Sequence, residues 1–218
     1  MESKVGFSNR PEPAIKRAVA FFDGQNLYHH AKAAFGYHHP NYDPKKLFDA
    51  VCAMRGYRAD GVRFYTGRPN QVKEPMWAGY WAARLLAMRR SGILVTDRPL
   101  RYRSIDAFDE HGAPIIKEVP EEKGIDVRIA LDVVRLARSN QYDVGVIFSQ
   151  DQDLSEVAND VREIGADQGR WIKIASAYPT SSTATAGRGL DKTDWIPIER
   201  DVYDQCIDPR DYRPKSKA

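Results

Sequence analysis

The chain has 218 residues, 42% of them hydrophobic and 11% aromatic, which is enough for one sizeable core. Its formal net charge of +3 is compatible with a polyanionic partner but too small to indicate one. The two cysteines have no metal-ligand spacing, no apolar stretch approaches the length of a membrane span, and the N-terminus lacks the apolar core of a signal peptide. These features exclude a disulfide scaffold and a membrane-spanning protein, and we expect a reduced, cytoplasmic protein.

Short apolar runs alternate with helical patterns along the chain. Runs rich in β-branched residues predict buried strands, and apolar positions at helical spacing predict the helices between them. In chain order we predict a strand at 18–22, helices at 27–35 and 44–54, a strand at 62–66, a helix at 75–90, a strand at 93–96, a hairpin with its tip at 110–112, a helix ending near 138, a strand at 144–148, a helix from 154, a strand at 171–175, an edge element at 194–198 and a short helix at 202–206.

This order predicts an α/β fold with three layers, α/β/α, around a mostly parallel central sheet. We expect one domain at residues 16–206. A flexible arm (1–15) is expected before it and a disordered basic tail (207–218) after it. The stretch 179–188 is rich in Ser, Thr and Gly, and we expect it to be a mobile loop over the strand ends.

The first acidic candidate follows the first predicted strand. Asp23 comes directly after the apolar run, and Gly24 allows the backbone to turn sharply beside it. Asn26 can either cap the next helix or bind a neighbouring carboxylate. In an open α/β sheet, ligands bind at the carboxyl ends of the strands, so Asp23 is a candidate site residue.

The helix predicted at 75–90 has a buried side and a basic surface. Trp77 and Trp81 are four residues apart and share a face, which favours packing over base stacking. Helical spacing predicts a buried side formed by Met76, Tyr80, Leu85 and Met88. The basic surface is assigned to Arg84, Arg89 and Arg90.

Three arginines follow the strand predicted at 93–96. Arg98, Arg101 and Arg103 surround Tyr102, and such a strip can hold phosphates beside an aromatic side chain. An exposed strand edge protected by charge explains the same residues equally well. The sequence leaves both interpretations open.

Another acid lies at the start of the helix that ends near residue 138. Asp126 precedes Ile129 and Ala130 by three and four residues, so it projects from the inward-facing stripe. Interaction with the positive helix N-terminus explains an acid in the first turn but not its inward direction. Asp132, further along the helix, is interpreted as a rim or structural acid.

Two more acids follow the strand predicted at 144–148. After Ser149 the chain places Asp151 and Asp153 one residue apart, before the next helix. Like charges held this close are unfavourable unless a cation or a shared proton compensates them. The alternative is that Asp153 caps the helix while Asp151 is a solvated loop acid.

These acids together predict a metal site at one edge of the sheet. Carboxylate oxygens select Mg²⁺ or Mn²⁺ over zinc, and such an ion can activate a water for attack on a phosphodiester. Lys123 is the one basic residue within the motifs. The predicted metal-binding and catalytic acids are Asp23, Asp126, Asp151 and Asp153.

Three segments carry a family resemblance. FFDGQN (21–26), EKGIDV (122–127) and SQDQD (149–153), in this order and context, resemble the signature blocks of the NYN-domain ribonucleases, a branch of the PIN-like nucleases. The resemblance extends over residues 17–198. It implies an endoribonuclease whose four acids hold Mg²⁺ or Mn²⁺ and which usually leaves a 5′-phosphate.

The resemblance also implies supporting roles. Asn26 and Ser149 are expected to support the acids by hydrogen bonds, and Asp194 stands where the family often has a late acid. Leu154 departs from the aromatic residue that is frequent at its position. The expected partner is single-stranded RNA, held by Arg98 and the neighbouring arginines. No membrane partner is expected, and the formation of homo-oligomers stays open.

Two other classes of function compete with this one. A PIN-like module without activity, which binds RNA or a protein, would have the same fold, but the intact set of acids argues against it. A phosphatase with an aspartyl nucleophile needs DxD after the first strand, where this chain has Asp23-Gly24-Gln25. A response-regulator receiver needs paired acids there. The chain contains neither a P-loop nor a GxGxxG motif.

Overall fold

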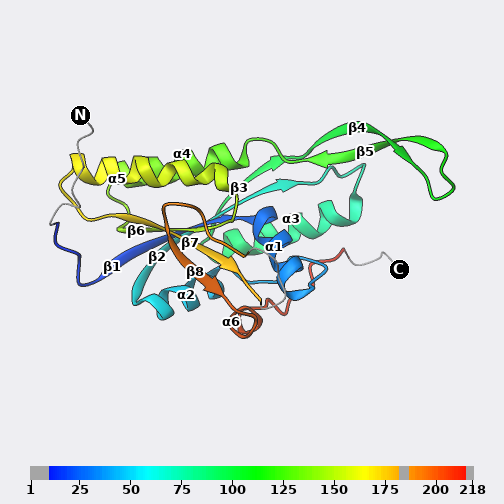
Figure 1. Cartoon of the computed structure of the whole chain (residues 1–218). Coiled ribbons are helices and arrows are strands. Elements are labelled where there is room, and N and C mark those ends of the chain that lie inside the picture. The colour runs from blue at the N-terminus through cyan, green and yellow to red at the C-terminus, as the bar shows by residue number, and fades with distance from the viewer. Residues whose placement is uncertain (1–9, 182–186, 215–218) are drawn as a thin grey trace, which may run out of the picture.

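A six-stranded parallel sheet forms the middle layer of the molecule (Figure 1). The computed structural model describes residues 10–181 and 187–214. All neighbouring strands in the sheet are parallel, which confirms the predicted α/β fold. Across the sheet the strands are β3 (Leu94–Pro99), β2 (Tyr57–Arg68), β1 (Lys16–Asp23), β6 (Val144–Phe148), β7 (Lys173–Pro179) and β8 (Asp194–Ile198).

Helices cover both faces of the sheet, as the three-layer prediction requires (Figure 1). One face packs against α4 (Ile125–Arg138) and α5 (Val157–Asp167), the latter preceded by a 3₁₀ turn, η1 (Gln152–Glu156). The other face packs against α1 (Gly24–Phe35), α2 (Pro44–Arg55), α3 (Pro75–Arg90) and α6 (Arg200–Gln205). None of the helices in the described ranges is long and apolar enough to cross a membrane.

The two central strands, β1 and β6, are buried because each is an almost continuous apolar run. Phe22 pairs with Phe148 in register, and the two rings stack with centroids 3.9 Å apart. Each buried Phe side chain contributes roughly 1.5–3 kcal/mol. This packing fixes the carboxyl ends of both strands side by side, so the residues that follow them meet.

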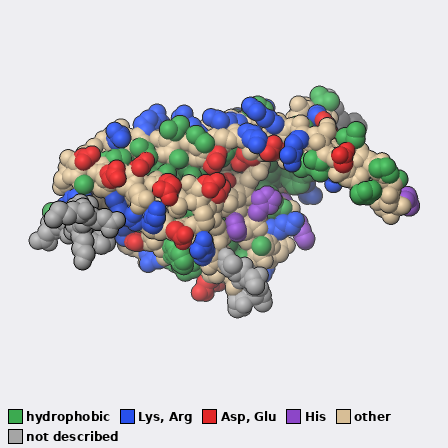
Figure 2. Space-filling model, turned by 45° about the horizontal axis from the view of Figure 1, so that its top comes forward, with side chains coloured by type: hydrophobic (Ala, Val, Ile, Leu, Met, Phe, Trp, Pro, Cys, Tyr) green, Lys and Arg blue, Asp and Glu red, His purple; other side chains and the backbone are tan. Residues whose placement is uncertain are grey.

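A hairpin projects from the body beyond the sheet (Figure 1). It consists of β4 (Arg101–Phe108) and β5 (Pro114–Glu121), which pair antiparallel, and its turn lies at the predicted tip. In Figure 2 hydrophobic side chains are visible along this hairpin, and its exposed members are Phe108, Ile115 and Ile116. The body contacts the hairpin through Tyr102, whose hydroxyl donates to Glu74 Oε1 (2.6 Å).

Arg84 is completely buried, so its assignment to a basic surface was wrong. Its guanidinium donates to the carbonyl of Pro40 and to that of Tyr42 (2.7 Å), and it lies over the rings of Tyr42 and Trp81. Helical spacing could not predict this, because the carbonyls come from the loop between α1 and α2. Met76, predicted to be buried, is 44% exposed.

We expect Arg84→Met to lower the free energy of unfolding by about 2–3 kcal/mol, because the carbonyl of Tyr42 loses its donor inside the core and that of Pro40 keeps only the hydroxyl of Tyr80. Urea unfolding measures this change. Arg90→Met, at an exposed position on the same helix, is the matched control and should stay within about 0.5 kcal/mol of the wild type. Equal stability of both variants would mean that these carbonyls are satisfied without Arg84.

The expected disorder of the tail does not hold for residues 207–214. Ile207 forms a bridge with Tyr42, and the ring of Tyr212 packs edge-on against Tyr80 of α3. The tail therefore closes over the α3 side of the molecule because its aromatic and apolar residues find partners there. Residues 1–9 of the predicted arm, 182–186 of the predicted mobile loop and 215–218 of the tail lie outside the described residues.

Candidate active site

Asp23 lies at the carboxyl end of β1 and is 5% exposed. Its Oδ1 accepts a hydrogen bond from the backbone N–H of Asn26 (3.0 Å), and the Ser149 hydroxyl lies 3.4 Å from its Oδ2 as a donor. Asp23 is therefore the N-cap of α1, and the interpretation of Asn26 as a cap was wrong. Gly24 lies against the ring of Phe64, and the close approach, rather than a left-handed turn, excludes a side chain there.

Asn26 and Ser149 connect the ends of the two central strands. Asn26 Oδ1 accepts from the backbone N–H of Gln150 (2.9 Å), and Ser149 Oγ accepts from the backbone N–H of Asp151 (3.2 Å). Ser149 thus contacts Asp23 directly, whereas Asn26 holds the loop that carries Asp151. These hydrogen bonds fix the relative position of the two strand ends.

Asp151 and Asp153 have different environments. Asp151 is half-buried, and its Oδ1 accepts from the backbone N–H of Asp153 (3.1 Å), so Asp151 is the N-cap of η1. Asp153 is exposed in the first turn of η1. The alternative in which Asp153 caps the helix was therefore wrong.

Two of the predicted acids, Asp126 and Asp151, act on Asp23 through their charges. Burial is the main cause that raises the pKa of Asp23 to about 6; the negative charges of Asp151 and Asp126 add to the rise, and the hydrogen bonds from Asn26 and Ser149 oppose it. Asp126 lies in the first turn of α4. Asp153 is not among the main contributors to this shift. Asp126 and Asp151 thus lie near enough to Asp23 for their charges to act on it, and Asp153 is exposed.

Glu122 belongs to the same group, and our sequence analysis did not identify it. One of its carboxyl oxygens accepts from the backbone N–H of Gly67 at the end of β2. Burial raises the pKa of Glu122 to about 8, with further contributions from the charges of Asp23 and Asp126. The signal was present, because Glu122 opens the EKGIDV segment. A side chain at position 67 would collide with Leu100 and with the carboxyl group of Glu122, so the close approach of Glu122 needs a glycine there.

These four acids lack the compensation that other buried acids have. Within the described ranges, no salt bridge includes Asp23, Glu122, Asp126 or Asp151. Lys123, the basic residue of the motif, pairs with Glu121 instead (2.7 Å). By contrast Asp132, 1% exposed, is surrounded by Arg63, Arg128, Arg135 and the hydroxyl of Tyr65. Asp132 is thus a structural acid.

Asp194 does not join the group. It is the first residue of β8 and forms a salt bridge with Lys173, the first residue of β7. Since these strands are parallel to β1, both residues lie toward the amino ends, whereas Asp23 lies at a carboxyl end. Its placement as a late acid of the site is wrong for this reason.

The three arginines lie along a path from the acids to the hairpin. Arg98, in β3, reaches toward the carbonyl of Lys123 (3.5 Å) and lies against Gly124, the N-cap of α4. Arg101 and Arg103 are exposed on β4. In Figure 2 Lys and Arg side chains form a row along the upper margin of the molecule, reaching the base of the hairpin. Cationic side chains thus flank the acidic site on the hairpin side.

The chemistry of the four acids fits a hard divalent cation. All donors are carboxylate oxygens, and their mutual repulsion has no cationic partner in the described part of the chain. In this arrangement no three His, Cys, Asp or Glu side chains within residues 10–181 and 187–214 stand close enough to hold a metal ion. A cation would therefore need the carboxylates to move toward one another.

Comparison with known proteins identifies the family to which the sequence is similar. The sequence model of the NYN domain matches residues 17–186, most of the chain. No curated protein matches the chain. Among solved structures, the crystal structure of Acinetobacter baumannii MurG is similar with a TM-score of 0.31 and 11% identity, over 84% of this chain and 45% of that chain. The chain thus spans less than half the length of that protein.

Proposed function

Because the chain belongs to the NYN domain family, a PIN-like and generally nuclease-like family, we propose that it is a metal-dependent endoribonuclease. One observation carries the proposal: the charges of Asp126 and Asp151 act on Asp23, and those of Asp23 and Asp126 act on Glu122, and these four carboxylates have no cationic partner among the described residues. A cation or a shared proton compensates such repulsion, and donors that are all carboxylate oxygens favour a cation.

The acids divide into two roles in this proposal. Asp23, Asp126 and Asp151, together with Glu122, form the cation site, and Asp153 stands at its exposed rim. A Mg²⁺ or Mn²⁺ ion bound there would neutralise the scissile phosphate and lower the pKa of the attacking water. Asp23 and Glu122 must lose their protons for such an ion to bind, since both have raised pKa values.

Ser149 and Asn26 act as positioning residues. The Ser149 hydroxyl orients one oxygen of Asp23, and the amide of Asn26 holds the backbone of Gln150, which fixes the loop that carries Asp151. Arg98 stands at the edge of the acidic site, where it can contact a phosphate of the bound strand.

Cleavage of labelled single-stranded RNA in Mn²⁺ and in EDTA tests the proposal. We expect internal cuts in Mn²⁺ and none in EDTA. A chain that binds the RNA but leaves it uncut in Mn²⁺ and in Mg²⁺ would instead be a PIN-like binding module, which is the second candidate. This candidate is favoured by one observation, the absence of three groups at metal-binding distance within residues 10–181 and 187–214.

The arginines of the hairpin should hold the strand by its phosphates. We expect the double substitution Arg101→Gln and Arg103→Gln to weaken RNA binding and to reduce the slope of log K against log salt by about 1.4, or about 0.7 for each lost phosphate contact. Fluorescence anisotropy at several salt concentrations measures this slope. Arg90→Gln, exposed near the end of α3, is the control. An unchanged slope in the double variant favours the edge-protection interpretation of these arginines.

A further inference from the structure

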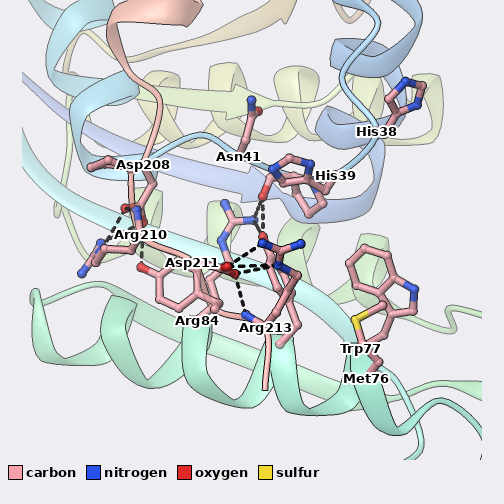
Figure 3. A pocket seen from close by; sticks show the side chains of 14 residues that line it. His38, His39, Asn41, Met76, Trp77, Arg84, Asp208, Arg210, Asp211 and Arg213 are labelled. Carbon is pink, nitrogen blue, oxygen red and sulfur yellow. Dashed lines mark hydrogen bonds and ion pairs between the residues drawn. The ribbon is translucent and has the colours of Figure 1, made fainter. Parts of the chain in front are cut away.

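A cavity of about 500 Å³ lies on the α3 side of the sheet. Three segments line it: the loop between α1 and α2, the N-terminal part of α3, and the C-terminal segment 208–213. Figure 3 shows Met76 and Trp77 on one side, Asp208 and Arg210 on the other, and His39 between them in this view. Its size is in the range of pockets that hold small ligands.

The cavity has an excess of positive charge. Its two acids are already paired, Asp208 with Arg210 (2.8 Å) and Asp211 with Arg213 (2.6 Å). Arg84, the third arginine of the lining, is completely buried and has no carboxylate within salt-bridge distance in the described residues. Its Nε has no hydrogen-bond partner there either. A buried cation without an anion favours an anionic ligand nearby.

The cavity also offers an aromatic surface. Trp77 is half-buried and packs edge-on against Tyr80, with ring centroids 5.4 Å apart. Beside it Met76 is 44% exposed. An aromatic ring next to arginines is the combination with which proteins hold unpaired bases, because every base can stack and every phosphate attracts a guanidinium. Exposed Arg213 supplies such a group at the rim.

The cavity is close to the acidic site. Arg84 lies 5.2 Å from the ring centroid of Tyr42, and the ring of Tyr42 stacks on that of Phe22 at 6.1 Å. Phe22 is the residue before Asp23. Two buried rings thus lie between the Arg84 guanidinium and the strand end that carries Asp23.

We propose that this cavity binds an unpaired nucleotide of the RNA strand, with the base against Trp77 and the phosphate toward the arginines. This inference rests on the proposed function for the identity of the strand. It assigns Trp77 to base stacking in addition to packing, and it places a specificity-determining subsite on the face of the sheet opposite to α4.

Binding of a short fluorescein-labelled oligouridine in EDTA tests the subsite without cleavage. We expect Trp77→Ala to weaken binding about tenfold, within the range of one lost base stack, and Trp77→Phe to retain most of the affinity. Leu86→Ala is the matched control, because Leu86 is exposed on the same helix and does not line the cavity. It should bind like the wild type.

Met76→Glu provides a second variant at an exposed position, should Trp77→Ala fail to fold. Its new negative charge should also weaken binding, with an unchanged melting temperature. Wild-type affinity in folded Trp77→Ala or in Met76→Glu, or the absence of any binding by the wild type, would overturn the subsite. Cleavage in Mn²⁺ is scored separately, so an active enzyme with an unaffected Trp77→Ala variant disproves the subsite alone.

Discussion

Asp151→Asn is expected to reduce RNA cleavage in Mn²⁺ by about 100-fold or more, since even residues that only support metal ligands cost about 10–100-fold when removed. The fold should survive, because an Asn side-chain oxygen can still accept from the backbone N–H of Asp153 and cap η1. Initial rates on labelled RNA at saturating Mn²⁺ measure the loss.

The same variant should make the metal-free protein slightly more stable. Asp151 is one of the charges that raise the pKa of Asp23, so its removal relieves repulsion. A gain of about 1 kcal/mol corresponds to a melting temperature about 2–4 °C higher for a chain of this size. Asp160→Asn, exposed in the first turn of α5, is the control and should leave both quantities unchanged. Cleavage by Asp151→Asn at the wild-type rate would remove Asp151 from the catalytic group.

Comparison with Asp153→Asn separates the inner acids from the rim. Asp153 is exposed and is not among the main groups that raise the pKa of Asp23, so we expect its loss to reduce cleavage less than the loss of Asp151. Equal losses would mean that both acids of the SQDQD segment bind the cation directly.

Stability of the metal-free chain is expected to fall as the pH rises from 5 to 9. Glu122 and Asp23 have folded pKa values of about 8 and about 6, above their ordinary values of 4.5 and 3.8. An acid with a raised pKa binds its proton more tightly in the folded state. Its contribution to the stability of the fold is complete below the unfolded pKa and is lost as the pH rises to the folded pKa. The windows are therefore 4.5 to about 8 for Glu122 and 3.8 to about 6 for Asp23.

Glu122→Gln should remove the part of this loss of stability that extends up to a pH of about 8. Glutamine resembles the protonated acid, so at pH 9 we expect the variant to be about 2–3 kcal/mol more stable than the wild type, after allowance for solvent near the partly exposed group. At pH 5 the two should nearly coincide. Urea unfolding across the pH range in EDTA measures the difference, with Glu163→Gln, exposed on α5, as the control. Parallel curves for wild type and Glu122→Gln would mean that Glu122 titrates normally.

Mn²⁺ should reduce the loss of stability that the wild type shows as the pH rises. Binding the cation releases the protons of Asp23 and Glu122, so the stabilisation by Mn²⁺ should increase with pH. In Glu122→Gln this increase should be smaller, because one of the two protons is no longer released. Thermal melting at fixed Mn²⁺ concentration gives both results.

The order of elements and the position of Asp23 were predictable because their signals are local. A continuous apolar run predicts a buried strand wherever it occurs, and parallel strands place their carboxyl ends at the same edge. Asp23 and Asp151 each follow such a run, so their proximity followed from the predicted topology. The family match over residues 17–186 agrees with the blocks that contain them.

The neighbours of each side chain were decided by the tertiary structure. Glu122 joins Asp23 only because Gly67, at the end of β2, leaves room for its carboxyl group. Arg84 is buried only because a distant loop turns two carbonyls toward it, and Asp194 meets Lys173 only through the register of β7 and β8. The sequence by itself determined where strands and helices form, because backbone preference and apolar spacing act over a few residues. Which charges are paired, buried or gathered was decided by packing between segments far apart in the chain, and no local pattern records that packing.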